Sequence, residues 1–456
     1  MALTDANDLP ARRAFVRVPA RLKTWLAGEH GAAQRMAGTA FAIRVLSAAV
    51  VFASQILLAR WMGSFEYGTY VYVWTWLLLV GDIVHLGLPL TAQRYIPEYI
   101  QRGAPDRLRG YLIGSRWLTF GLGTTVAILG AWLVHSLAGS LDRHIVMPLY
   151  FACVALPFYA FSFMLDGVAR SYDWIGLALM PHSLLRPILI LALIGGICLA
   201  GLPLDATTTM LATAIAIWTT ALGQLLALNR RLARSVAAGA RTYDIRGWFA
   251  TSLPMIAVWG MYTLLTTTDV LVLQLFRPAD DVAHYYAASK TLTLVTFIYF
   301  AVAAAAGHRF TGYHVAGDRD GLARVVTTTI RWIFWPSLAA VLLILAAGKP
   351  MLWLFGPGFM DAYPVMFVLA VGLLARAAVG PAERLLTMVG QQRVCAIAYT
   401  AAFAVNLAGC FTLAKPYGGI GVAMATSAAF VTESVLLFLI ARRRLGLHLF
   451  VWRPAR

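Results

Sequence analysis

Apolar residues in this chain are gathered into long continuous runs, separated by short polar stretches. Twelve runs reach about 20 residues, the length that an α-helix needs to cross a hydrocarbon layer of about 30 Å. Because the runs are continuous rather than alternating, they predict helices and not the strands of a barrel. The expected helices have approximate bounds 36–62, 67–91, 111–138, 146–167, 179–201, 207–229, 248–275, 284–307, 329–355, 363–380, 393–414 and 418–441.

Composition agrees with a membrane protein. Hydrophobic residues make up 60% of the 456 residues and charged residues only 12%, against about 25% charged in an ordinary soluble domain. The four cysteines fall inside predicted helices and show no metal-ligand spacing. We therefore predict an all-α polytopic membrane protein with neither a metal site nor a cofactor.

Positive charge sets the expected orientation. Of the 37 Lys and Arg, 26 lie in segments on the side of the N-terminus, 4 lie on the other side, and 7 lie within predicted helices. Since Lys and Arg accumulate in cytoplasmic segments, both termini are predicted to be cytoplasmic, with a basic arm at 1–35 and a basic tail at 442–456. The net charge of +17 then lies beside anionic lipid headgroups, so we expect no nucleic-acid partner.

The chain contains an internal repeat. A shift of 215 residues aligns Arg94 with Arg309 and Trp117 with Trp332, and it superimposes six predicted helices on six. An even number of helices separates the copies, so they keep the same orientation. This predicts two pseudo-symmetric six-helix bundles, at 36–230 and 248–441, joined by a cytoplasmic linker at 231–247. Transporters with this plan bind their substrate between the halves.

One polar stretch, QRYIPEYIQRG at 93–103, follows the second apolar run. We interpret it as the inner end of the second helix. There Tyr95 and Tyr99 would lie among lipid headgroups, and Pro97 would stop or kink the helix.

Several blocks of sequence carry a resemblance to a known family. These are LLARWMGSFEYGTYVYVW (57–74), GLPLTAQRYIPEY (87–99), SLPMIAVWGMYTLLTTTDVLVLQLF (252–276), YYAASK (285–290), FGPGFMDAYPVM (355–366) and GPAERLLTMVGQQR (380–393). Over roughly 36–441 the chain resembles the polysaccharide and O-antigen flippases of the multidrug/oligosaccharidyl-lipid/polysaccharide exporter superfamily.

The resemblance implies a MATE-like fold and a transporter rather than an enzyme. It implies a monomer that moves undecaprenyl-diphosphate-linked oligosaccharide across the bacterial inner membrane by alternating access. The product would be a surface polysaccharide, such as lipopolysaccharide, or an exopolysaccharide. Membrane lipids, glycosyltransferases and a polysaccharide polymerase are the partners that such a protein would have.

A diphosphate brings about two negative charges into a low-dielectric cavity, where guanidinium and ammonium groups suit its oxygens. Cations within the predicted helices are costly, at about 2.5–3.5 kcal/mol each at the bilayer centre, so they need a polar surrounding. We predict that Arg44, Arg186, Lys290 and Arg376 converge on one cavity between the halves. Pairing with a carboxylate or snorkelling to the surface remains the alternative for each. Secondary or interfacial positions are Arg116, Arg331 and His182.

The acidic residues within predicted helices are fewer. Asp269, Asp82 and Glu433 are candidates for binding a coupling proton or Na⁺, because burial readily tunes a carboxylate. Asp269 could instead neutralise Lys290. Asp166 and Arg170 are expected to form a local i,i+4 pair.

Two other functions are open to the sequence. A MATE-type drug or cation antiporter would favour carboxylates and aromatic residues, whereas the predicted helices hold seven Lys and Arg against four Asp and Glu. A membrane polysaccharide polymerase or acyltransferase would need a sizeable outward loop or a His/Asp cluster, and the sequence shows neither.

Overall fold

The computed structural model describes residues 29–316 and 318–452, and all regular structure in these ranges is helical. The predicted basic arm, 1–35, lies outside the described residues except for its last seven, which begin the first helix. The last four residues of the predicted tail also lie outside them.

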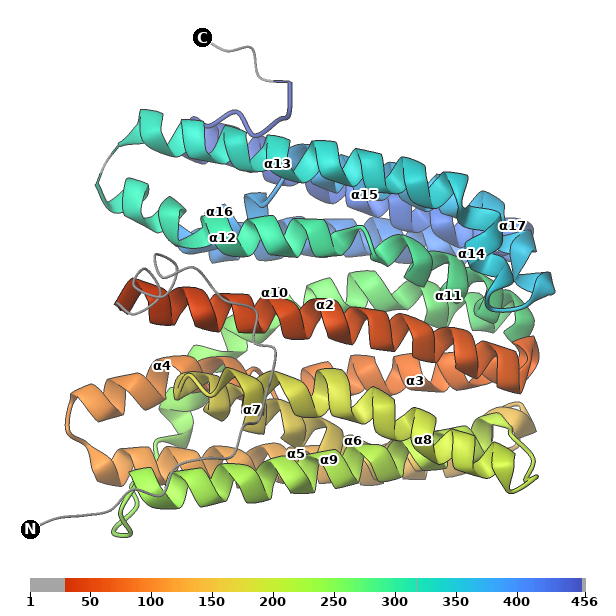
Figure 1. Ribbon diagram of the computed structural model, residues 1–456, viewed down its shortest axis with the longest axis horizontal. Helices are drawn as coiled ribbons and strands as arrows, with labels where there is room; N and C mark the ends of the chain where they lie inside the picture. The colour runs from red at the N-terminus through yellow and green to blue at the C-terminus, as the bar shows by residue number, and fades with distance from the viewer. Residues whose placement is uncertain (1–28, 317, 453–456) are drawn as a thin grey trace, which may run out of the picture.

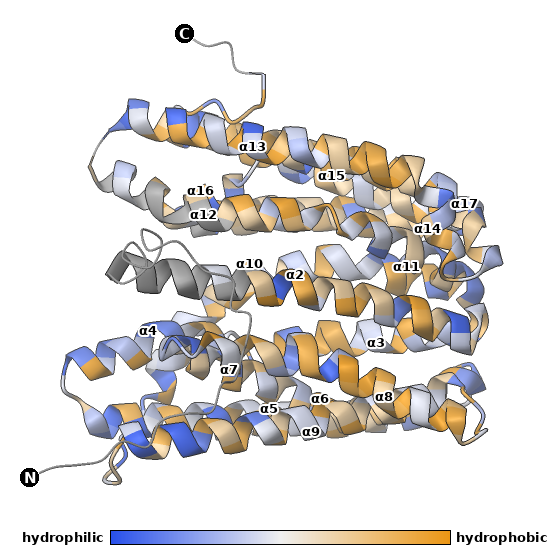
Figure 2. Cartoon of the chain, in the orientation of Figure 1, coloured by the Kyte–Doolittle hydropathy of each residue, from blue (hydrophilic) through white to orange (hydrophobic). Residues whose placement is uncertain are grey.

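The first half of the chain forms a bundle of long helices that run side by side (Figure 1). Figure 2 shows apolar residues along the middle of these helices and hydrophilic ones toward their ends, as a membrane-spanning bundle requires. The elements are α2 (Glu29–Met62), α3 (Ser64–Val84), α4 (Leu88–Gln101), α5 (Pro105–Leu137), α6 (Arg143–Ser171), α7 (Ile175–Met180), the π-helical turn η1 (Pro181–Leu185), α8 (Arg186–Leu199) and α9 (Ala206–Ser235).

The second half begins after a connection without helix at 236–244. Its elements are α10 (Ile245–Phe276), α11 (Ala279–Thr293), α12 (Thr296–Val315), α13 (Arg319–Ala346), α14 (Gly348–Trp353), the 3₁₀ turn η2 (Pro357–Ala362), α15 (Tyr363–Val379), α16 (Ala382–Met388) and α17 (Gln392–Leu445).

The halves repeat each other in the order of their helices. α3 begins at Ser64 and α11 at Ala279, 215 residues later. α3 packs directly against α11, since a Cβ added to Gly68 would lie 1.8 Å from the carbonyl oxygen of Ala279. The prediction of an all-α membrane protein with two related six-helix bundles is confirmed.

Eleven of the described helices are long and apolar enough to cross a membrane. One of them, α17, is a hairpin: Gly418 leaves the helical conformation, with φ 55° and ψ −135°. A Cβ on Gly421 would lie 2.1 Å from the carbonyl oxygen of Leu413, which places the two arms antiparallel. α17 therefore supplies the eleventh and twelfth predicted crossings.

The second crossing breaks where the sequence did not predict a break. Leu86 and Gly87 adopt left-handed conformations, with φ 48° and 78°, and separate α3 from α4. Pro97 lies inside α4 and does not end it, so the predicted stop at Pro97 is wrong. A proline inside a helix removes a single backbone hydrogen bond and need not end the helix, whereas a left-handed pair cannot continue one.

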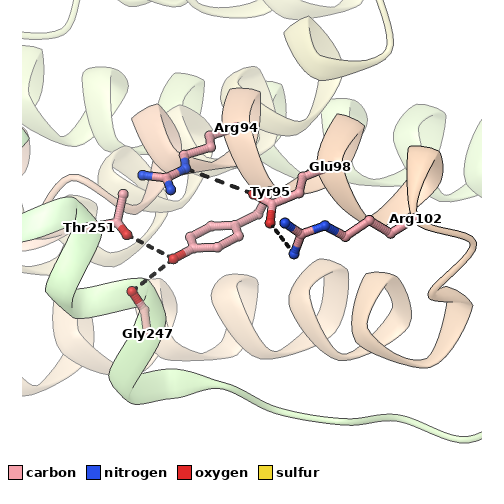
Figure 3. Close-up of polar contacts among 6 residues, drawn as sticks. All are labelled: Arg94, Tyr95, Glu98, Arg102, Gly247 and Thr251. Carbon is pink, nitrogen blue, oxygen red and sulfur yellow. Dashed lines mark hydrogen bonds and ion pairs between the residues drawn. The ribbon is translucent and has the colours of Figure 1, made fainter.

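The polar end of α4 packs against the start of α10 (Figure 3). The Tyr95 hydroxyl lies 2.9 Å from the carbonyl oxygen of Gly247, to which it donates, and 2.8 Å from the Thr251 hydroxyl. Tyr95 is only 9% exposed, so the expectation that it lies among headgroups is wrong. Arg94 and Arg102 are exposed and flank Glu98, at 3.9 and 2.6 Å.

Candidate functional site

A cavity of about 410 Å³ lies between the halves, and we call it the basic cavity. α2, α3, η1 and α8 line it from the first half, and α11 and α12 from the second. Its charged lining residues are Arg186 and Lys290, with His182 beside them. Within the described part of the chain, no Asp or Glu lines this cavity. Its charge is therefore positive.

Arg186 is held rigidly in the wall of the basic cavity. Its side chain is 5% exposed, donates to the Ser162 hydroxyl at 2.9 Å, and lies 5.3 Å from the ring centre of Tyr159. The Nε group has no hydrogen-bond partner among the described residues. The guanidinium thus keeps one unused donor, and the same residue lines the cavity.

The turn before Arg186 explains this placement. Residues 181–185, PHSLL, form the π-helical turn η1, with Pro181 at its start and Pro187 just beyond Arg186. A proline cannot donate the hydrogen bond that continues a helix, and π-helical turns are common at functional sites. His182, half-buried in the same turn, lines the cavity with its ring 6.0 Å from that of Phe163.

Lys290 faces Arg186 from the second half. It lies on α11, half-buried, with its ammonium 4.7 Å from the ring centre of Tyr286. Among the described residues it forms no ion pair, so Asp269 does not neutralise it directly. The two cations thus lie in one cavity without a carboxylate partner, which favours an anionic ligand.

Arg44 lies on α2, and its side chain is exposed. Ser47, Val51 and Leu58 on α2 line the basic cavity. Arg44 precedes Ser47 by three residues, so it belongs to the same helical face, one turn closer to the start of α2. This places it beside the cavity rather than in its wall.

Arg376 lies elsewhere. It lines a second cavity of about 370 Å³, formed by the second half and Leu90 of α4. We call it the aromatic cavity because Trp259, Tyr262, Tyr299, Phe300 and Tyr399 line it. The guanidinium lies 3.3 Å from Glu433 and over the rings of Tyr262 and Phe430, at 5.4 and 4.8 Å. The structure therefore brings Arg186 and Lys290 together, places Arg44 next to them, and separates Arg376 from all three.

The secondary cations have other surroundings. Arg116 donates to the Asn229 side chain at 2.7 Å and thereby joins α5 to α9. Arg331 lies exposed on α13. Neither lines the basic or the aromatic cavity.

The acidic candidates are also dispersed. Asp269 is buried and accepts hydrogen bonds from the Tyr285 hydroxyl at 2.6 Å and from the backbone N–H of Val270 at 2.8 Å. Asp82 accepts from the Tyr159 hydroxyl at 3.5 Å. Asp166 and Arg170 form the expected pair, at 2.8 Å.

Sequence reasoning missed Ser162, Tyr159 and Glu383. Ser162 and Tyr159 hold Arg186 from another helix, and no sequence spacing signals such a contact. Glu383 lines the aromatic cavity, although it lies in a segment expected to be an inner loop. Nothing in its sequence position distinguishes it from a solvated loop charge.

Comparisons with known proteins agree with this architecture. A family model described as "Polysaccharide biosynthesis protein" matches residues 38–307, more than half of the chain. No curated protein sequence matches the chain.

Several solved structures are similar to the chain. An inward-facing multidrug resistance MATE family transporter of the MOP superfamily has a TM-score of 0.70 and 15% identity, covering 89% of this chain and 94% of the other. The lipid II flippase MurJ, in an inward closed conformation, gives 0.69 and 15% over 88% and 87%. A MOP superfamily transporter from Pyrococcus furiosus gives 0.64 and 14% over 94% and 99%. At these identities the likeness establishes the fold.

Proposed function

Because the chain belongs to the polysaccharide biosynthesis protein family, we propose that it is a flippase for undecaprenyl-diphosphate-linked oligosaccharide. It would serve surface or exopolysaccharide synthesis in the bacterial inner membrane, with both termini cytoplasmic. The observation that carries the proposal is the pairing of Arg186 and Lys290 in one cavity between the halves, without a carboxylate in its lining.

The cavity suits a diphosphate on physical grounds. Arg186 offers a buried, unpaired N–H donor in a planar group, and Lys290 offers a mobile point charge from the facing half. Two cations match the charge of a diphosphate, and the low dielectric strengthens their attraction to it. Arg44, beside the cavity, would attract the headgroup from the inner leaflet.

Alternating access would then expose the basic cavity to each side of the membrane in turn. Contacts between the halves support closure at the outer end in this conformation: Arg60 of α2 donates to the carbonyl oxygens of Trp353 and Leu354, at 2.8 and 2.7 Å. The diphosphate would enter from the cytoplasmic side and leave when these contacts open.

The test is to delete the gene and follow the lipid-linked oligosaccharides. We expect them to accumulate on the inner leaflet while glycan synthesis continues, and the wild-type gene to restore export. The Arg186→Gln/Lys290→Gln double variant, at normal protein level, should fail to restore it. Full export by that variant would contradict the assignment of the site. The absence of any accumulation in the deletion strain would contradict the proposed function itself.

The remaining expectations belong to the same proposal. The protein would act as a monomer beside glycosyltransferases and a polymerase, without catalytic chemistry of its own. Asp269, Asp82 and Glu433 are the candidates for the coupling-ion site.

A further inference from the structure

Glu433 on α17 is a buried carboxylate that is only half satisfied. The residue is 3% exposed, and its Oε1 lies 3.3 Å from the guanidinium of Arg376. Its Oε2 has no hydrogen-bond partner among the described residues. Leaving a buried acceptor unpaired costs about 1–3 kcal/mol, and more when the group is charged. The site therefore has room for a further hydrogen-bond donor at Oε2.

A small cavity lies at this place. It has a volume of about 10 Å³, close to that of a single water-sized sphere, and is lined by Glu433, Arg376, Glu383, Tyr299 and Ser434. Ser434 donates its hydroxyl to the carbonyl oxygen of Phe430 at 2.8 Å. Glu383 and Arg376 also line the larger aromatic cavity, so the two spaces share part of their walls.

The charges here are unequal. Two carboxylates, of Glu383 and Glu433, line the small cavity, against the single guanidinium of Arg376. Arg384, the other cation near Glu383, does not line this space and forms no ion pair among the described residues. The remaining titratable groups around the carboxylates are Tyr262 of α10, Tyr299 of α12, and Cys395 and Tyr399 of α17. Among the residues that line it, the small cavity thus has one more carboxylate than guanidinium.

We propose that Glu383 and Glu433 share one exchangeable proton beside Arg376, and that this is the site of the coupling proton. The proton forms an O–H bond with one carboxylate, hydrogen-bonds the other, and leaves to water in the aromatic cavity. Burial supports the proposal, because it raises the pKa of Glu383 above its ordinary value in spite of Arg376 and Arg384. Proton binding stands on this geometry alone, whereas its coupling to transport rests on the proposed function.

A proton suits the site better than Na⁺. The guanidinium of Arg376 already lies beside Glu433 and would repel a second fixed cation. A proton neutralises one carboxylate and removes the excess charge without needing several oxygen ligands in so small a space.

The proton can be observed without cargo. The full-length protein is purified in lipid nanodiscs, and infrared difference spectra are recorded between acidic and alkaline pH. The wild type should show the absorption of a protonated carboxyl group that disappears as the pH rises. The Glu383→Gln/Glu433→Gln variant should lose this signal. Glu98→Gln, which removes the partner of the exposed Arg102, should keep it.

Two outcomes would overturn the proposal. One is an unchanged carboxyl signal in the double variant, which must first be shown to fold by its thermal transition. The single variants are measured if the double one does not fold. The other is a lower pH midpoint of the carboxyl signal when Na⁺ replaces K⁺ in the buffer. That shift would identify a Na⁺ site instead. Because no oligosaccharide is present, neither outcome depends on the flippase proposal.

Discussion

The guanidinium of Arg60 lies 4.8 Å from the ring centre of Trp353 and donates a hydrogen bond to the carbonyl oxygen of the same residue at 2.8 Å. Arg60 lies in the last turn of α2 in the first half, and Trp353 ends α14 in the second. The Ser64 hydroxyl and the Asp280 carboxylate make a further contact between α3 and α11. The two halves are therefore fastened together at the end of the bundle where α2 ends and α3 begins.

A covalent bond at this contact should stop transport. We expect a disulfide in the Ser64→Cys/Asp280→Cys variant to hold the outer end closed and to abolish export, since opening requires these residues to separate. Export of labelled polysaccharide is measured after oxidation and again after reduction, which should restore it. Either single cysteine variant is the control. Export that continues through the oxidised double variant would show that the outer ends need not part.

Replacement of Arg186 should weaken cargo binding more than replacement of a remote arginine. A hydrogen bond to a charged group contributes about 1.5–3 kcal/mol, so Arg186→Gln should lower export or affinity about tenfold or more. Arg186→Lys keeps the charge but loses the planar donor group, so it should retain only part of the wild-type export. Arg116→Gln, which breaks the bond to Asn229 outside both cavities, is the matched control. Equal losses in Arg186→Gln and Arg116→Gln would count against a role in binding.

Gly81 should tolerate no side chain. A Cβ at this position would lie 2.2 Å from Cδ1 of Tyr159, so Gly81→Ala must displace the ring against which Arg186 packs. We expect a loss of about 1–3 kcal/mol in the free energy of unfolding, together with weaker export. Thermal unfolding in detergent measures the first effect. Gly223→Ala, with nothing within 4 Å of the added Cβ, should leave both unchanged.

The Tyr95 hydroxyl should contribute to the inner contact between the halves. Tyr95→Phe removes the bonds to Gly247 and Thr251, so we expect a loss of about 1 kcal/mol in stability. A lower unfolding temperature in detergent would show this loss of stability. Tyr417→Phe, at an exposed position on the α17 hairpin, should unfold like the wild type. An unchanged transition in Tyr95→Phe would show that the inner contact does not depend on this hydroxyl.

The fold was largely predictable from the sequence because membrane helices have a strong signal. Continuous apolar length marks a crossing without any knowledge of its neighbours, and this holds even for the hairpin at Gly418, where KPYGG separates two runs. The break at Leu86 was not predictable. Leucine favours helix, and only the packing around it holds the left-handed conformation.

The site was predictable in part. A cation within a predicted membrane helix is expected to have a partner, but the sequence does not say which residue that partner is. Arg186 and Arg376 look alike in the sequence, yet one keeps an unpaired donor and the other lies against Glu433. The partner of Arg376 comes from a helix more than fifty residues away, and such a contact depends on how the bundle closes.

Leu86 holds a backbone conformation that costs a residue with a side chain about 1–3 kcal/mol, at the joint between α3 and α4. Above this joint, α3 is packed tightly against α11; below it, α4 meets the start of α10 through Tyr95. The second crossing is thus bent at a strained residue. Straightening it would relieve the strain at Leu86 and move α4 relative to α3, which stays packed against α11.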